Sequence, residues 1–234
     1  MKPAAFAYEA PRTRDAALAL LAEHGEDGKI LAGGQSLVPT MNFRLAQPND
    51  ADRHQSPARL ATIARAGAEL RIGALSRHAR FERPVTDGPL GKLLPEVARH
   101  IAHTPIRTRG TFGGKPGACR PGVGMVRDRA LALNARMIAE STTGTRAIPA
   151  ADFFKSIFTT ALRPDELLTE IRLPQLDETW RCGFAEYSRT RRRLRPGDGG
   201  GRAAARPGRG PRGLDRARRR SARRRWPPSA PRGS

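Results

Sequence analysis

The chain has 234 residues, of which 38% are hydrophobic, and a formal net charge of +21. The two cysteines, Cys119 and Cys182, exclude a disulfide framework and are too few to bind an iron–sulfur cluster within this chain. No apolar run approaches the roughly 18 residues that a membrane span needs, and the N-terminus lacks the apolar core of a signal peptide, so we expect a cytoplasmic protein.

The N-terminal part of the chain predicts two short strands around one amphipathic helix. Residues 4–9 favour a strand, and Thr13 is suited to cap a following helix that Gly25 ends. Residues 29–32 predict a second strand, which leads through a glycine turn into a helix over 37–45. A strand, a glycine turn and a helix start therefore follow one another.

The middle of the chain adds further short strands and helices. Strands are predicted over 60–63, 69–72 and 166–173, and a short helix over 75–81. Apolar residues recur at helical spacing in 89–103, which predicts the clearest amphipathic helix of this part. Short strands that alternate with helices are typical of an α/β or α+β domain.

The turn Gly33-Gly34-Gln35-Ser36 is the first candidate binding site. Its glycines allow the backbone to approach a ligand closely, and the N–H groups of the turn and of the following helix offer donors and a positive dipole end. This chemistry suits a pyrophosphate, and the same four residues also suit an ordinary turn.

A longer stretch around this turn resembles a known family. LAGGQSLVPTMNFRLAQP, residues 31–48, is similar to the first flavin-binding segment of the medium, FAD-binding subunit of molybdenum hydroxylases, the carbon monoxide dehydrogenase and xanthine dehydrogenase family. The resemblance continues in LRIGALSRH at 70–78, HIAHTPIRTRGTFGG at 100–114 and IPAADFFKSIFTTALRPDELLTEIRLP at 148–174. It covers most of residues 1–187 in the family's order.

The resemblance implies an α+β fold with two FAD-binding subdomains, of the vanillyl-alcohol-oxidase/PCMH type. The first subdomain would span residues 1–55 and the second 56–175. Residues 176–188 would begin a C-terminal α+β domain like that of the carbon monoxide dehydrogenase flavoprotein, which stays incomplete here. Residues 189–234 would form a disordered basic tail.

The resemblance also implies which residues hold the cofactor. In the family two glycine segments wrap opposite sides of FAD, the first at its pyrophosphate, and a third stretch lies near the flavin ring. The family usually has asparagine where Thr108 stands, and we expect no acid–base catalyst in this chain. The implied cofactor-binding residues are Ala32, Gly33, Gly34, Gln35, Ser36, Thr111, Gly113, Gly114, Leu167 and Leu168.

The function that the resemblance implies is electron transfer. FAD would accept electrons that leave a molybdenum centre through [2Fe–2S] clusters and would deliver them to NAD⁺, a quinone or another acceptor. The clusters and the molybdopterin would belong to a small iron–sulfur subunit and a large molybdopterin subunit of a hetero-oligomer. The substrate would be selected by the large subunit.

Three segments interrupt the resemblance. After GTFGG the family usually continues with a text like SLAHADPA, whereas this chain has KPGACRPGVGMVRDR at 115–129. If the coding DNA is read one nucleotide later from the Lys115 codon, the genetic code permits the sequence SLAHADPASEWCVT. The same shift permits MLIDINR over 49–56 and, from Thr190, a stretch that ends in DFALAMAA, close to family text after GFAEYSR. Our hypothesis is a conceptual translation with frameshifts, two locally restored and the last never restored.

The tail supports two further hypotheses. Residues 189–234 hold 17 arginines and two aspartates, a net charge of +15, so they could bind RNA or DNA phosphates. Only Trp226 could stack on a base there, so this hypothesis depends on charge alone. The chain could also be a non-functional flavoprotein relic. If the frameshift hypothesis is right, the tail is out-of-frame text, nucleic acid is no partner, and the chain binds flavin weakly or not at all.

Overall fold

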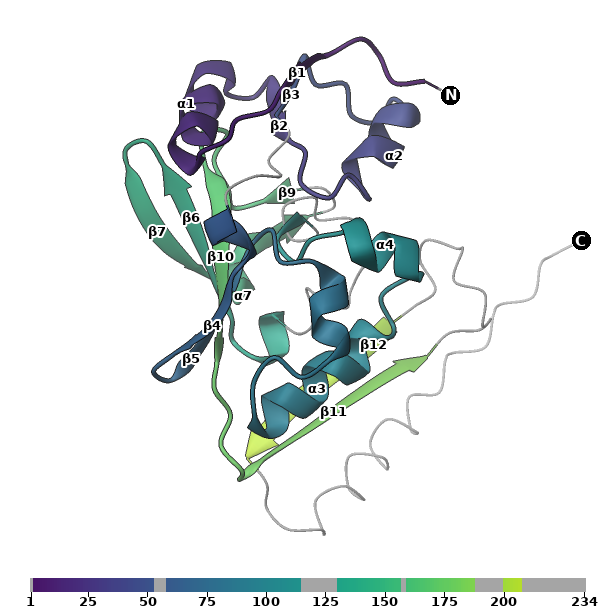
Figure 1. The fold of residues 1–234 in the computed structure, drawn as a ribbon, viewed down its shortest axis with the longest axis vertical. Coiled ribbons are helices and arrows are strands. Elements are labelled where there is room, and N and C mark those ends of the chain that lie inside the picture. Colours follow the sequence, from purple (N-terminus) through teal and green to yellow (C-terminus); the bar gives the residue numbers. More distant parts are fainter. Residues whose placement is uncertain (1, 53–57, 115–129, 157–158, 188–199, 208–234) are drawn as a thin grey trace, which may run out of the picture.

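The computed structural model describes residues 2–52, 58–114, 130–156, 159–187 and 200–207. In this part of the chain, strands form one parallel sheet, one larger antiparallel sheet and two short hairpins. Figure 1 shows the parallel sheet at the top, with the antiparallel sheet below it and helices along one side. The mixture of helices and mostly antiparallel strands is an α+β fold.

The parallel sheet comes from the N-terminal part of the chain. It contains β1 (Ala7–Glu9), β2 (Gly28–Ile30) and β3 (Asp50–Asp52), with β3 in the middle. Helix α1 (Arg14–His24) connects β1 to β2, and α2 (Leu37–Asn42) follows the glycine turn. The chain therefore crosses over once by a helix before it reaches the turn.

Helix α1 begins and ends where the sequence predicts. The Thr13 side chain accepts a hydrogen bond from the Ala16 N–H at 3.1 Å, and Gly25 ends the helix with a φ of 54°. The buried face of α1 packs on a small hydrophobic cluster. The members of this cluster are Ala17, Leu18, Leu21, Leu60, Leu75 and Leu167.

The antiparallel sheet has five strands in the order β4-β5-β10-β6-β7. Its main core lies on the side of α3 (Gly88–Ala98), where apolar side chains of the central strands meet the helix. Strand β10 occupies the middle and pairs with β5 and β6. The strands are β4 (Ile63–Ala66), β5 (Glu69–Gly73), β6 (Arg136–Ser141), β7 (Gly144–Pro149) and β10 (Leu167–Pro174).

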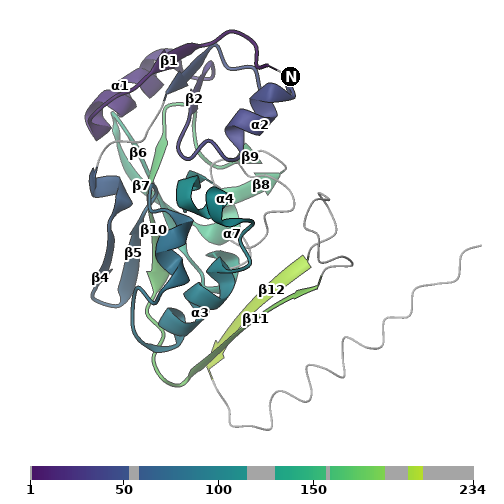
Figure 2. The same cartoon turned by 45° about the vertical axis from the view of Figure 1, so that its right-hand side comes forward.

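Short elements complete the described part. Strands β11 and β12 form a hairpin that lies beside α3, and its apolar residues Trp180, Cys182 and Phe184 pack on the main core (Figure 2). The elements are η1 (Ala58–Ala61), η2 (His78–Glu82), α4 (Thr104–Arg109), α7 (Ala150–Phe153), β8 (Phe154–Ser156), β9 (Thr159–Thr160), β11 (Trp180–Tyr187) and β12 (Gly200–Pro207).

Several predicted elements differ in type or length. The helix predicted over 75–81 is the 3₁₀ helix η2, and the helix predicted over 37–45 ends at Asn42. The strand predicted over 60–63 is the 3₁₀ turn η1 followed by β4, because the Leu60 carbonyl accepts from the Leu75 N–H at 2.7 Å instead of a strand partner. The helix predicted over 89–103 ends at Ala98, and α4 begins after it. The break has a physical cause, since Ala102 adopts a φ of 42° that no right-handed helix contains.

The predicted disordered tail falls mostly outside the described residues. Its described stretch, Gly200–Pro207, differs from that prediction because it forms β12 and pairs with β11 along its whole length. Backbone pairing needs no apolar side chains, which is why composition did not reveal this strand. Residues 115–129, the second interrupted segment, also lie outside the described part.

Candidate functional site

The two glycine segments meet in the structure. We call residues 32–36 the first loop and residues 110–114 the second loop. A Cβ atom at Gly33 would lie 2.3 Å from the Arg109 carbonyl oxygen and 2.8 Å from the Gly110 Cα, and one at Gly114 would lie 3.4 Å from the Ala32 Cβ. Figure 1 shows the first loop, which leads from β2 to α2, directly above α4. The segments that the sequence separates by over 70 positions thus form one site.

The first loop presents backbone donors. Gly34 has a φ of +71°, which glycine adopts without strain, and its carbonyl accepts from the Val38 N–H at 3.2 Å. None of the backbone hydrogen bonds between described residues uses the N–H groups of Gly33, Gly34, Gln35 or Ser36. Successive N–H groups of this kind form a favourable site for an anion. Helix α2 is only six residues long, so the loop itself contributes most of this potential.

The second loop is a scaffold for the first. Its N–H groups donate to carbonyl oxygens of the protein. Gly110 donates to Ile106 at 2.7 Å, Phe112 to Ser76 at 2.8 Å and Gly113 to Ala74 at 2.8 Å. The Gly114 N–H donates to the buried Thr111 hydroxyl at 3.0 Å. The described part of this loop therefore holds a fixed shape and offers few donors to a ligand.

The side chains of Leu167 and Leu168 are buried in two different cores. Leu167 is 3% exposed and belongs to the cluster under α1, on which Ala32 of the first loop also packs. Leu168 is 6% exposed and belongs to the main core. Only the backbone of these two residues could face a ligand. The Leu167 side chain belongs to the cluster on which Ala32 of the first loop packs.

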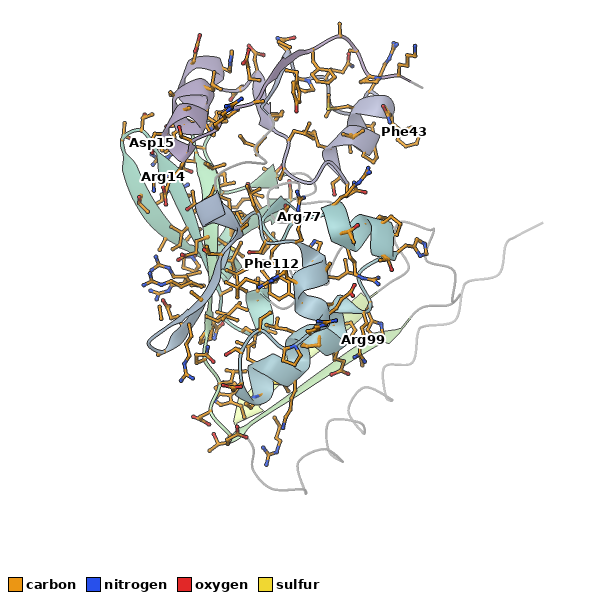
Figure 3. The ribbon with its side chains drawn as sticks, in the orientation of Figure 1. Arg14, Asp15, Phe43, Arg77, Arg99 and Phe112 are labelled. Atoms are coloured by element: carbon orange, nitrogen blue, oxygen red, sulfur yellow. The ribbon has the colours of Figure 1, made fainter. Side chains whose placement is uncertain are left out.

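Sequence reasoning missed two arginines that hold the backbone on either side of α4. Arg77 donates through Nη1 to the Arg109 carbonyl, and Figure 3 shows Arg77 at the level where the first loop meets α4. Arg107 donates to the Ala102 carbonyl at 2.7 Å and pairs with Glu82 at 2.5 Å. Their spacing carries no recognisable signal, because each acts through a backbone carbonyl, which any residue type supplies.

Other candidate sites receive no support in the described part of the chain. There, no three His, Cys, Asp or Glu side chains gather in a way that could hold a metal ion. Burial raises the pKa of the Cys182 thiol, which makes this cysteine a poor nucleophile at neutral pH. Nor does any described helix combine the length and the apolar character required to cross a membrane.

A family model and several known proteins match most of the chain. Residues 4–176 match the family described as the FAD binding domain in molybdopterin dehydrogenase. The chain is 40% identical over 190 residues to the 6-hydroxypseudooxynicotine dehydrogenase complex subunit alpha of Paenarthrobacter nicotinovorans. This match covers 81% of this chain and 64% of that relative. It is 36% identical over 180 residues to the carbon monoxide dehydrogenase medium chain of Hydrogenophaga pseudoflava, with 74% and 60% covered.

Solved structures agree with these relatives. Carbon monoxide dehydrogenase from Hydrogenophaga pseudoflava superimposes with a TM-score of 0.75 at 34% identity, over 85% of this chain and 67% of that one. Quinoline 2-oxidoreductase from Pseudomonas putida 86 gives 0.73 at 34% identity, over 85% and 66%. The chain spans 60 to 64% of the length of the two curated relatives above. It belongs to the family of FAD-binding domains of molybdopterin dehydrogenases.

Proposed function

We propose that this chain is the FAD-binding part of a molybdenum hydroxylase complex and passes electrons from a partner's iron–sulfur clusters to NAD⁺, a quinone or another acceptor. The observation that carries the proposal is the first loop, whose N–H groups at Gly33–Ser36 donate to no backbone carbonyl of the described residues. Such donors suit the diphosphate of FAD. When bound, FAD supplies the redox chemistry, and the protein supplies position and electrostatics.

Each part of the site has a separate task in this proposal. The first loop binds the diphosphate, and the second loop fixes its position through the contact of Gly33 with Arg109 and Gly110. Leu167 and Leu168 fix strand β10, because the Leu167 side chain is buried in the cluster under α1 and the Leu168 side chain in the main core.

The partners follow from composition and from the relatives. Two cysteines are too few for a cluster, so the clusters belong to another subunit. The relatives are named as a complex subunit and as a medium chain, which supports a hetero-oligomer with a small iron–sulfur subunit and a large molybdopterin subunit. One of these names contains 6-hydroxypseudooxynicotine and the other carbon monoxide, which supports substrate selection outside this chain.

The sequence of β3 supports the frameshift hypothesis. This strand is paired on both sides, with Asp50 opposite Ala7 and Gly28, and Asp52 opposite Glu9 and Ile30. Aspartate is depleted in strands, and a central parallel strand is normally apolar. The shifted text MLIDINR supplies such residues, so we propose that the natural protein has this text and that the present chain binds FAD weakly.

The first experiment is to resequence the coding DNA across Asn49, Lys115 and Thr190. The second compares this chain with one that carries the three shifted segments, and measures the flavin absorbance per chain after gel filtration with FAD. We expect about one FAD on the corrected chain and far less on the present one. A corrected chain without flavin would contradict the FAD function. A tightly held FAD on the present chain would contradict the proposed frameshift damage but would leave the FAD function intact.

A further inference from the structure

We propose that the antiparallel sheet docks an acidic helix of a partner protein on its face opposite α3, through a row of three arginines. We call Arg71 on β5, Arg172 on β10 and Arg136 on β6 the arginine row. The inference goes beyond the proposed function, because it concerns a protein contact and does not depend on whether this chain binds FAD.

The three arginines stand side by side on neighbouring strands. Arg172 is paired directly with Arg71 on one side and with Arg136 on the other. Residues in such register have Cβ atoms about 5 Å apart, and like charges directly opposite one another destabilise a sheet. The arginine row is therefore a cost to the isolated fold, which an anionic partner would remove.

The arginine row is accessible from solvent. Successive side chains of a strand point to opposite faces, and the neighbours of the three arginines belong to the main core on the side of α3 (Figure 2). These buried neighbours are Ile72, Ile171 and Met137. Arg71 and Arg136 are exposed, and the Arg172 side chain is 27% exposed. The row thus lies on the opposite face, where a partner can reach it.

Two glutamates neutralise part of the arginine row and leave donors free. Glu69 accepts from the Arg136 Nη2, and Glu170 accepts from the Arg172 Nε at 2.5 Å. Within the described part of the chain these two arginines use only that one nitrogen each, and the Arg71 side chain has no ion pair or hydrogen bond. Because arginine has five N–H donors, the row retains donors and net positive charge for carboxylates.

The spacing of the arginine row matches the spacing of acids along a helix. Adjacent strands lie about 4.8 Å apart, so the row spans about 10 Å. Acids at positions i, i+4 and i+7 share one side of a helix and advance about 10.5 Å along its axis. A helix that lies across the three strands would therefore bring one carboxylate to each arginine. Helices commonly cover sheet faces in this way.

The surroundings of the arginine row favour a protein over a nucleic acid. Glu69 and Glu170 repel every phosphate of a nucleic-acid strand, whereas a helix can present lysine or neutral side chains to them. The neighbours at the two ends of the row are Ala64 and Pro149, so the row offers no aromatic ring on which a base could stack. An acidic helix is therefore the occupant that this face fits.

The test titrates peptides into the isotope-labelled full-length chain and follows the amide resonances of the arginine row. The probe is an alanine-based helix of about 20 residues with glutamates at i, i+4 and i+7. A second peptide has the same composition but spreads its glutamates around the helix, and oligo(dT) is the nucleic-acid probe. Amide resonances distinguish this face from residues 189–234, whose arginines attract any polyanion.

Arg71→Gln and Arg71→Glu are the test variants, and Arg65→Gln is the matched control. Arg65 is also exposed, but it lies opposite Leu70 and hence on the face of the main core. We expect Arg71→Gln to weaken binding of the one-sided peptide about threefold, Arg71→Glu to weaken it further, and Arg65→Gln to leave it unchanged. Since Arg71→Gln removes a like charge beside Arg172, its thermal midpoint should not fall.

Three results would overturn the proposal. The first is that the one-sided peptide, up to about 1 mM, shifts none of the amides of the arginine row. The second is equal binding of the two peptides, or equal binding of the one-sided peptide to the parent and to both Arg71 variants. The third is that oligo(dT) shifts these amides more than the peptide does, which would assign the face to nucleic acid. None of these results concerns the flavin site, because no nucleotide cofactor enters the test.

Discussion

Gly33 and Gly34 are neighbours with different physical reasons to be glycine. A Cβ at Gly33 would overlap backbone atoms of Arg109 and Gly110, so glycine there permits contact between two loops. Gly34 has a positive φ of +71°, and a Cβ there would meet only ordinary contacts, with Val38 at 3.4 Å. The first position thus controls assembly of the site, and the second controls the direction of its N–H groups.

Gly33→Ala should separate the loops. Because the overlapping atoms are backbone, they cannot turn away as a side chain could, and we expect a loss of about 1–3 kcal/mol in unfolding free energy. Urea denaturation measures this loss. Gly183→Ala in β11 is the control, since a Cβ there meets nothing within 4 Å. Equal stabilities of the two variants would show that the loops are not in contact.

Glu166 is a second residue whose chemistry depends on the fold. Burial raises its pKa, but a side-chain hydrogen bond from Arg146, a backbone hydrogen bond from Arg163 and their charges outweigh burial, so the pKa lies below its ordinary value. The Arg146 fork contacts both carboxylate oxygens, at 2.5 and 2.7 Å. This pair connects β7 to the residue that precedes β10.

The lowered pKa of Glu166 predicts a pH dependence of stability. The contribution is complete above the ordinary pKa of 4.5 and is lost as the pH falls through the lower folded value. Glu166→Gln should cost about 1–2 kcal/mol at pH 7, because Arg146 is partly exposed, and the difference from wild type should shrink in acid. Unfolding measured from neutral pH to acid checks this. Arg146→Gln should flatten the acidic part of the curve of unfolding free energy against pH. A difference between wild type and Glu166→Gln that stays constant with pH would contradict the assignment of this pH dependence to Glu166.

At the scale of elements, α1 depends on its cap and on its buried face. Thr13→Ala removes the acceptor of the Ala16 N–H and should cost about 1 kcal/mol of unfolding free energy. Thr13→Ser retains a hydroxyl at the same place, so it should keep most of the stability. Thermal unfolding of both variants measures the difference. An alanine variant as stable as the serine variant would show that this cap contributes nothing.

The sequence predicted elements whose signals are local and missed those that depend on distant contacts. The Thr13 cap and the Gly25 end of α1 are signals within one segment, and both predictions are confirmed. The turn between α3 and α4 instead contacts Arg107, which bonds the Ile101 and Ala102 carbonyls and is itself paired with the distant Glu82. Such a contact leaves no periodicity in the sequence.

The candidate site was predictable only as two separate segments. Glycine pairs and the family resemblance identify the residues at 32–36 and 110–114. Their mutual contact and the part played by Arg77 arise from the folded backbone, because one carbonyl of Arg109 serves both. The burial of Leu167 and Leu168 in different cores follows from strand alternation, which sends successive side chains to opposite faces.

At the scale of the whole molecule, charge and fold are separated along the chain. Residues 189–234 contribute +15 of the net +21, and the described core lies almost wholly before them. Arginine-rich segments attract nucleic-acid phosphates without any specific contact, and such binding weakens steeply with salt. Affinity for nucleic acid would therefore report composition and not the site between the loops.

A chain that ends at Pro207 tests this separation. It loses ten arginines and one aspartate but keeps every described residue. We expect its affinity for single-stranded DNA at low salt to fall about tenfold or more, while its thermal midpoint stays unchanged. Fluorescence anisotropy with a labelled oligonucleotide measures the first quantity. Undiminished, salt-resistant DNA binding would instead favour a genuine nucleic-acid site in the folded part.

Strand β10 has a consequence for how the protein unfolds. Its adjacent residues Leu167 and Leu168 enter the two hydrophobic clusters, and the buried Thr169 follows at the irregularity in its pairing with β6. Neither cluster can melt without releasing the strand that the other needs. The two clusters therefore belong to a single cooperative unit, whose calorimetric and van't Hoff enthalpies of unfolding should coincide.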